Sequence, residues 1–154
     1  MFNQKNAWDR EYRNPKLVTG KEDPQADTLR FFKFLKKIEK YKAEDKVVLD
    51  LGCGTGRNSN YLAEIGNNVI GIEISNVALI LAKRRADELG VKVDYRLGDI
   101  GSSYDIEDNS VDIILDVTSS NSLDERGREI YLSEMNRVLK TNLKQGNLFL
   151  GDTI

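Results

Sequence analysis

The sequence predicts a single α/β domain in which a mostly parallel sheet carries helices on both faces. Two observations support this prediction. Short apolar runs alternate with segments of helical spacing, and capping or turn residues separate them. The length of 154 residues fits one domain. Because strands joined through helices need right-handed crossovers, we expect a doubly wound sheet.

The N-terminal part is expected to hold one helix ahead of the first strand. Residues 1–22 are polar, with Trp8 and Tyr12 as isolated aromatics. Asp23 is a plausible N-cap, with Pro24 at the first helical position. The apolar side chains that follow at helical spacing are Phe31, Phe34, Leu35 and Ile38.

The rest of the chain predicts about five strands. These are Val47–Leu51, Val69–Ile74, residues 91–97, Val111–Val117 and residues 146–154. Helices are expected between most of them. The first runs from residue 57 to Gly66, and the second from a Ser75 cap to Leu89 with Gly90 as its stop. The third begins at the capping-box pair Ser122 and Glu125 and runs toward Lys140.

A glycine-rich loop marks the expected binding site. Gly52, Gly54 and Gly56 follow the first strand and open the first helix of the core. In a Rossmann-like sheet, ligands bind beyond the carboxyl ends of the strands, and glycines there let the backbone approach closely. The next strand ends near Glu73, about where an acid meets a ribose diol. These residues predict a nucleoside site.

Two common nucleotide motifs do not fit this loop. The dinucleotide fingerprint is G-x-G-x-x-G, but here the third glycine comes one residue early and Arg57 occupies its place. The Gly-Lys-Ser/Thr of a phosphate-binding P-loop is absent. An NAD-dependent enzyme is therefore disfavoured.

The spacing Asp50-x-Gly52-x-Gly54-x-Gly56 resembles motif I of the class I S-adenosylmethionine-dependent methyltransferases, and the resemblance runs from about Lys46 to Leu150. It implies that S-adenosylmethionine is the cofactor, with ribose at Glu73 and adenine at Asp99. The residues it implies for cofactor binding are Trp8, Tyr12, Asp50, Gly52, Cys53, Gly54, Gly56, Asn58, Glu73, Ile74, Asp99, Ile100 and Asp116.

The resemblance also implies an activity: in-line transfer of a methyl group to a small molecule. The segment "AWDREYRN" resembles the N-terminal region of small-molecule-type members, in which an aromatic lid closes over the cofactor. The chain has no histidine, so Asp116 and Tyr12 are the candidates to accept a proton, with water as the other option. The polar run Thr118–Leu123 could position the acceptor. The Pro-Pro signature of base methylation is absent, which argues against a nucleic-acid partner, although the basic helix faces leave RNA as an alternative.

The C-terminal region departs from the family pattern. The family sheet usually ends in an antiparallel hairpin, whereas this sequence ends at Ile154, at or just after the expected fifth strand. We therefore expect a cap segment over residues 1–45 and a cofactor-binding core over residues 46–154 that lacks the hairpin. The open strand edge predicts a homodimer through strand five. The alternative is a non-catalytic fragment that binds S-adenosylmethionine or S-adenosylhomocysteine and acts through association.

Composition bears on the cellular location, metal binding, membrane association and partners of the protein. Cys53 is the one cysteine, so no internal disulfide is possible and a cytoplasmic location is expected. Without histidine and with a single cysteine, no metal site is expected. The sequence shows no long apolar span, so no membrane association is expected. A formal net charge of -2 gives no electrostatic reason for a polyanion partner.

Overall fold

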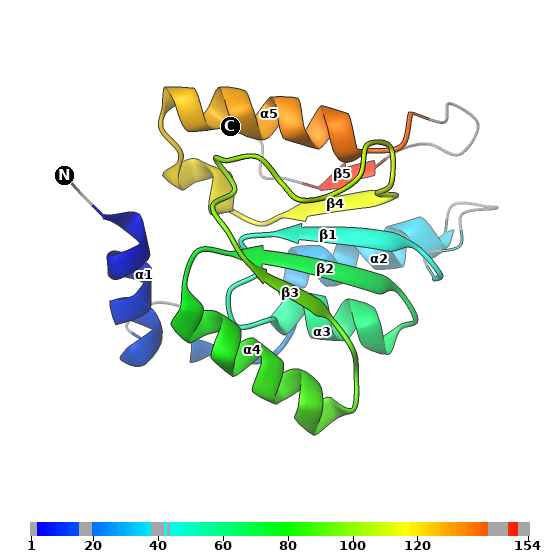
Figure 1. Cartoon of the computed structure of the whole chain (residues 1–154). Helices are drawn as coiled ribbons and strands as arrows, with labels where there is room; N and C mark the ends of the chain where they lie inside the picture. The colour runs from blue at the N-terminus through cyan, green and yellow to red at the C-terminus, as the bar shows by residue number, and fades with distance from the viewer. Residues whose placement is uncertain (1–2, 16–19, 38–41, 43, 142–147, 151–154) are drawn as a thin grey trace.

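The computed structural model describes residues 3–15, 20–37, 42, 44–141 and 148–150. It forms a parallel five-stranded sheet in the order β3-β2-β1-β4-β5 (Figure 1). The strands are β1 (Val47–Leu51), β2 (Asn68–Glu73), β3 (Asp94–Leu97), β4 (Ile113–Asp116) and β5 (Leu148–Leu150). The helices are α1 (Gln4–Arg13), α2 (Ala26–Lys37), α3 (Arg57–Glu64), α4 (Asn76–Leu89), the 3-10 helix η2 (Ser119–Ser122) and α5 (Glu125–Val138).

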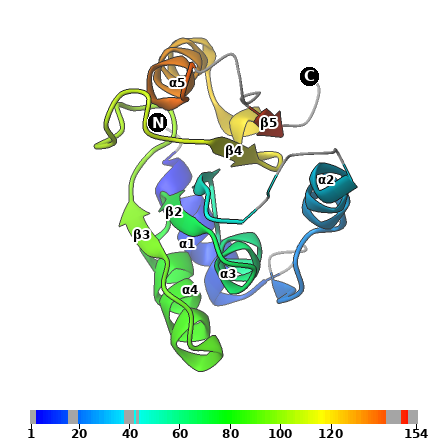
Figure 2. The ribbon, with the colours of Figure 1, turned by 90° about the vertical axis from the view of Figure 1, so that its right-hand side faces the viewer.

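The doubly wound architecture predicted from the alternating pattern is confirmed. Figure 2 shows α5 on the side of the sheet opposite α2 and α3. One core cluster joins Phe32 and Leu35 of α2 and Leu62 of α3 to β1. The other face packs Tyr131 and Met135 of α5 on the sheet. Because α2 shares its core with β1, the predicted cap segment over residues 1–45 contributes to the main core.

Strand register places three acids at one edge of the sheet. Leu51 of β1 lies opposite Ile72 of β2 and Asp116 of β4. Asp50, Glu73 and Asp116 therefore stand near the carboxyl ends of three adjacent strands, and all three are buried. This is the edge at which parallel α/β sheets bind ligands.

The N-terminal helix α1 was not predicted from the sequence, which offered only isolated aromatics in a polar segment. Asn3 caps this helix, its side chain accepting a hydrogen bond from the Asn6 amide. Figure 1 shows α1, in dark blue, beyond one end of the strands rather than in either helix layer. In this position α1 can cover the carboxyl edge of the sheet.

Two predicted helix starts were wrong. Helix α2 begins at Ala26 rather than after Asp23, because the Gln25 carbonyl accepts the first helical hydrogen bond, from Leu29. Helix α5 is capped by Asp124, whose carboxylate accepts from the Gly127 amide at 2.7 Å. At α2, the Gln25 amide donates to Asn58 Oδ1 at 2.9 Å, a partner that is distant in the chain and that a local pattern does not contain. At α5, the Ser122 hydroxyl donates to the Ser119 carbonyl at 2.8 Å, and Asp124 takes the capping position instead.

The strands also differ from prediction at their ends. Strand β3 begins at Asp94 rather than at residue 91, because the Val91 amide completes the end of α4 by donating to the Ala86 carbonyl. The predicted strand over residues 146–154 contains β5, and its other residues lie outside the described part. The dimer through the β5 edge stays a prediction. No helix in the described ranges is long and apolar enough to cross a membrane.

Candidate functional site

A cavity of about 260 Å³ opens at the carboxyl ends of the strands. Its walls come from α1, the start of α2, the loops after β1, β2, β3 and β4, and η2. Of the residues predicted to bind the cofactor, the cavity is lined by Trp8, Tyr12, Asp50, Gly52, Cys53, Gly54, Asn58, Glu73, Ile74, Asp99 and Ile100. The structure therefore brings most of the predicted site residues together around one volume.

The glycine loop shapes the floor of this cavity. Gly52 and Gly54 have φ of +70° and +55°, which L side chains rarely adopt. A Cβ at Gly52 would lie 2.0 Å from Ser119 Oγ, and one at Gly54 would lie 2.8 Å from Tyr12 Oη. Each glycine thus leaves room for a side chain from another element. Gly56 lies outside the lining and packs under Tyr95 instead, where a Cβ would come within 2.1 Å of the phenol oxygen.

Two backbone amides, one from the glycine loop and one from the residue that caps α4, hold the carboxylate of Glu73 at the cavity floor. Its Oε2 accepts from the Gly54 amide at 3.0 Å and its Oε1 accepts from the Ser75 amide at 2.8 Å. Burial raises the pKa of Glu73, and these amide bonds oppose that effect. Each oxygen keeps a further lone pair, so the carboxylate can accept two hydroxyl hydrogens.

Asp50 is the buried acid of β1. Its Oδ2 accepts a hydrogen bond from Ser59 Oγ at 2.6 Å. Burial raises the pKa of Asp50 to about 7, the Ser59 hydrogen bond opposes that rise, and the nearby Asp116 and Glu73 carboxylates add to it. This acid therefore changes charge near neutral pH.

Asp116 does not line the cavity. It is 1% exposed, and its oxygens accept hydrogen bonds from the Ser119 amide at 2.8 Å, the Ser120 amide at 3.2 Å and the Tyr131 hydroxyl at 2.5 Å. These bonds fix the first turn of η2 behind the cavity wall. In this position Asp116 organises the loop after β4 rather than facing the cavity with a free oxygen.

Helix α1 roofs the cavity with two aromatic rings. Trp8 and Tyr12 both line it, with ring centroids 6.0 Å apart. Burial, and then the charge of Glu73, raise the pKa of Tyr12. A phenol with a raised pKa stays protonated near neutral pH, so in this position Tyr12 is a hydrogen-bond donor.

The roof is fastened on both sides of the cavity. On one side, the buried Asp9 accepts hydrogen bonds from the Ser75 hydroxyl at 2.5 Å and from Lys5 at 2.9 Å. Those bonds lower the pKa of Asp9, so it is charged at neutral pH. On the other side, the Gln4 amide nitrogen donates to the Ser122 carbonyl. Helix α1 thus bridges the start of α4 and η2.

The other lining residues were not predicted to bind cofactor. They are Gln4, Gln25, Thr55, Arg57, Gly98, Val117, Thr118, Ser119 and Ser122. The predicted acceptor run Thr118–Leu123 accounts for three of them. Nothing in the sequence indicated that Gln4 and Gln25 would line the cavity. Gln4 is the first residue of α1 and Gln25 precedes α2, and the positions of both helices depend on partners that are distant in the chain. Arg57 was noticed only as the residue that breaks the dinucleotide spacing.

The chain matches the model of a family described as methyltransferase domain, over residues 48–142. The ubiquinone biosynthesis O-methyltransferase of Rhizobium etli is 32% identical over 105 residues, which cover 60% of this chain and 42% of that protein. A solved structure of an S-adenosylmethionine-dependent methyltransferase from Methanosarcina mazei has 33% identity and a TM-score of 0.60, covering 67% of this chain and 51% of that one.

The fold extends to more distant structures. The phosphoethanolamine N-methyltransferase 1 of Haemonchus contortus, solved with phosphoethanolamine and S-adenosylhomocysteine, has 23% identity and a TM-score of 0.68, covering 88% of this chain and 29% of that one. The chain spans less than half the length of the curated relatives it matches. With the matched domain covering more than half of its residues, the chain belongs to the class I S-adenosylmethionine-dependent methyltransferases.

Proposed function

We propose that this chain binds S-adenosylmethionine in the cavity at the carboxyl edge of the sheet and transfers its methyl group to a small molecule. The observation that carries the proposal is the pairing of Glu73 with the glycine loop. Glu73 lines the cavity and is held by the Gly54 amide, so a ribose acceptor and a close backbone approach lie side by side. That pair fits a nucleoside without a 2′-phosphate, which a buried carboxylate would repel.

Methyl transfer would depend on the alignment of the acceptor with the methyl group of the bound cofactor. The bound cofactor supplies an electrophilic methyl group, and the protein supplies binding and orientation. Trp8 and Tyr12 exclude water from above, and the hydroxyls of Thr118, Ser119 and Ser122 offer polar partners for an acceptor. Neither Asp116, which is engaged by three hydrogen bonds, nor the protonated Tyr12 is placed as a proton acceptor. The arrangement favours an acceptor that can react without losing a proton to the protein, or one that loses it to water.

The first test is calorimetric titration with S-adenosylhomocysteine. The wild-type chain is compared with Glu73→Gln, and Glu64→Gln on the exposed end of α3 is the matched control. We expect micromolar binding, weakened at least about tenfold by Glu73→Gln because the charged ribose acceptor is lost, and unchanged by Glu64→Gln. A folded wild-type chain that does not bind would contradict the proposal.

A second measurement separates catalysis from binding alone. Formation of S-adenosylhomocysteine from S-adenosylmethionine is followed across a panel of small acceptors. Turnover with any acceptor supports transfer by this chain. Tight cofactor binding without turnover across the panel would favour the alternative function, a binding module that acts through association.

A further inference from the structure

We infer that the outer face of α2 docks on an anionic lipid surface. The charged side chains exposed on this face are Asp27, Arg30, Lys33, Lys36 and Lys37. The cations therefore outnumber the acid, in a chain whose formal net charge is -2. The overall charge gave no electrostatic reason for a polyanion partner, but the structure gathers positive charge on the exposed side of one helix, which we call the α2 face.

The exposed sides of the other long core helices are electrically balanced. Arg84 of α4 pairs with Glu88 at 3.6 Å. On α2, Asp27 pairs with Arg30 at 3.3 Å, but it is the one acid of that helix, and three lysines follow. Surfaces of soluble domains usually mix both signs of charge, so an excess of one sign on a single helix indicates an anionic partner. The exposed charged residues of α4 and α5 are Lys83, Arg84, Asp87 and Glu88, and Glu125, Arg126, Arg128 and Glu129.

Apolar side chains are exposed on the α2 face beside these cations. Phe34 is 58% exposed and Leu29 is 39% exposed. A membrane interface suits this combination, because an aromatic ring can enter the headgroup layer while lysine stems lie along its apolar boundary and hold their ammonium groups at the phosphates. Helical spacing arranges the face in two adjacent rows, Arg30–Phe34–Lys37 and Leu29–Lys33–Lys36.

The fold presents the α2 face without any rearrangement. The opposite side of α2 is buried, with Phe32 and Leu35 in the core cluster of β1. Figure 2 shows α2 at the periphery of the molecule, on the side of the sheet away from α5. The expectation of no membrane association rested on the lack of a long apolar span, and no helix in the described ranges could cross a membrane. That finding excludes a spanning helix in those ranges and leaves a surface contact possible.

The residue types and shape of the α2 face favour a lipid surface over RNA. Its cations are mostly lysines, whose ammonium is a point charge on a flexible stem, whereas the arginine fork recognises phosphates with fixed geometry. Single-stranded nucleic acid is bound in positively charged grooves with aromatic platforms, but the α2 face is the convex outer side of a helix. A fluid layer of anionic headgroups needs neither a groove nor a fixed geometry.

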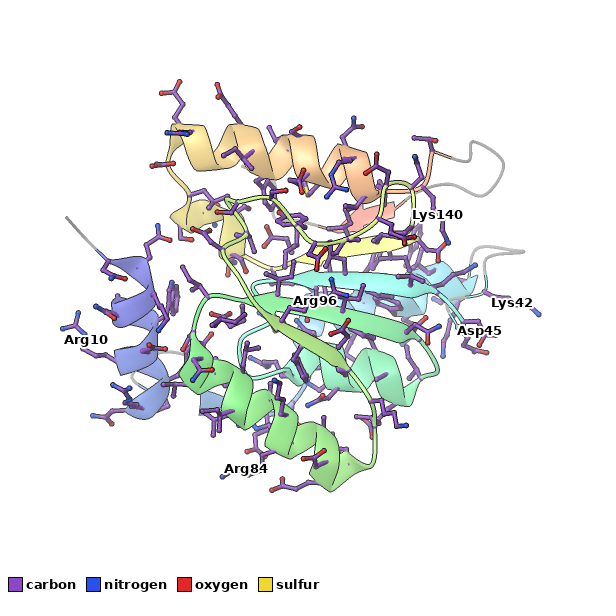
Figure 3. All side chains as sticks on the ribbon, in the orientation of Figure 1. Arg10, Lys42, Asp45, Arg84, Arg96 and Lys140 are labelled. Carbon is purple, nitrogen blue, oxygen red and sulfur yellow. The ribbon has the colours of Figure 1, made fainter. Side chains whose placement is uncertain are left out.

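The test is sedimentation of the full chain with two kinds of vesicle: phosphatidylcholine alone, and phosphatidylcholine mixed with phosphatidylglycerol. The variants are Lys33→Gln/Lys37→Gln and Phe34→Ala. The matched control is Lys83→Gln/Arg84→Gln, which removes the same charge from the outer surface of α4, where Figure 3 shows Arg84. Polyuridylate RNA is titrated in parallel. Circular dichroism and thermal unfolding show that each variant is folded.

We expect the wild-type chain to bind the anionic vesicles at low salt and to dissociate as salt screens the exposed charges. Lys33→Gln/Lys37→Gln should weaken this binding by about twentyfold, since each cation near an anionic surface contributes about fivefold. Phe34→Ala should weaken it by about threefold or more, because the ring no longer enters the interface. The α4 control should stay within about twofold of the wild-type chain, because its charges lie outside the docking face.

Four outcomes would overturn the inference. A folded wild-type chain that does not bind the anionic vesicles at low salt would leave the α2 face as a solvated surface, with no bearing on the proposed function. Equal binding to both kinds of vesicle would mean that charge is not the determinant. Equal losses in the α2 and α4 double variants would mean that the position of the charge does not matter. Binding to polyuridylate that exceeds vesicle binding and is lost in Lys33→Gln/Lys37→Gln would assign the face to RNA.

Discussion

The loop after β1 and the loop after β4 meet at the same cavity but are built in different ways. The first takes its shape from its own backbone, with three glycines of positive φ at alternate positions. The second takes its shape from a buried side chain, because Asp116 holds the amides of Ser119 and Ser120. The first loop offers backbone groups to a ligand, whereas the second offers hydroxyl side chains.

The two loops touch at Gly52, and the largest expected effect tests that contact. Gly52→Ala should reduce the free energy of unfolding by about 3 kcal/mol, because its Cβ would lie 2.0 Å from Ser119 Oγ and 2.4 Å from Ser119 Cβ at a φ of +70°. Adding Ser119→Gly should restore the part of the lost stability that the steric clash causes. A loss of about 1–2 kcal/mol should remain because of the backbone conformation. Chemical denaturation of the two single variants and the double variant measures both. Purely additive losses would mean that the loops do not interlock.

The second prediction separates the two loops. Asp116→Asn should destabilise the protein by about 2 kcal/mol, since it weakens three hydrogen bonds to a buried charge. It should leave the affinity for S-adenosylhomocysteine within about threefold, because Asp116 does not line the cavity. Tyr131→Phe, which removes only the phenol donor, should show a smaller loss of stability. A large loss of affinity in Asp116→Asn would place this acid in the cofactor site after all.

The third prediction concerns charge in the glycine-loop half. With its pKa raised to about 7, Asp50 is mostly protonated at pH 6 and mostly ionised at pH 8. Because the ionised form attracts the sulfonium, the affinity for S-adenosylmethionine should fall by up to about tenfold, or ~1.4 kcal/mol, as pH decreases from 8 to 6. S-adenosylhomocysteine, which lacks the sulfonium, should lose less. The ratio of the two dissociation constants at each pH measures the effect, and Asp50→Asn should make the ratio independent of pH.

The same shift affects the stability of the ligand-free chain. The pKa of Asp50 is raised in the folded state, so the folded chain binds more protons than the unfolded chain between about pH 4 and pH 7. Its contribution to stability is therefore full below about pH 4 and decreases as pH rises toward 7. A loss of stability from this group on acidification through that interval would contradict the assignment.

The smallest expected effect lies at Thr118, where the loop after β4 adopts a φ of +71° without a glycine. Thr118→Gly should stabilise the protein by about 0.5–1 kcal/mol, the cost of that φ for a β-branched residue less the entropy of a glycine. Thr118→Ala keeps a Cβ and should gain little. Thermal unfolding compares the two variants. A gain with alanine equal to that with glycine would mean that the hydroxyl or the branching, rather than φ, is unfavourable.

The parts of the site that lie close together along the chain were predictable from the amino-acid sequence. The spacing of Gly52, Gly54 and Gly56 after an apolar strand placed the glycine loop, and the next strand end placed Glu73. These positions were predictable because strand, loop and helix follow one another without distant partners. The family model then confirmed the resemblance that these residues suggested.

The residues that cover the cavity and those that lie behind its wall depend on contacts between elements that are distant in the chain. Asp9 meets Ser75 across 66 residues, and Gln4 meets Ser122 across 118, so the roof over the site has no local signature. Asp116 looked like a residue of the active centre because it ends β4, but its two oxygens turn to η2 and Tyr131. A sequence pattern places a side chain on a strand end. Which of its neighbours satisfies a buried carboxylate depends on the packing of elements that are distant in the chain, because a buried charge needs partners wherever the fold supplies them.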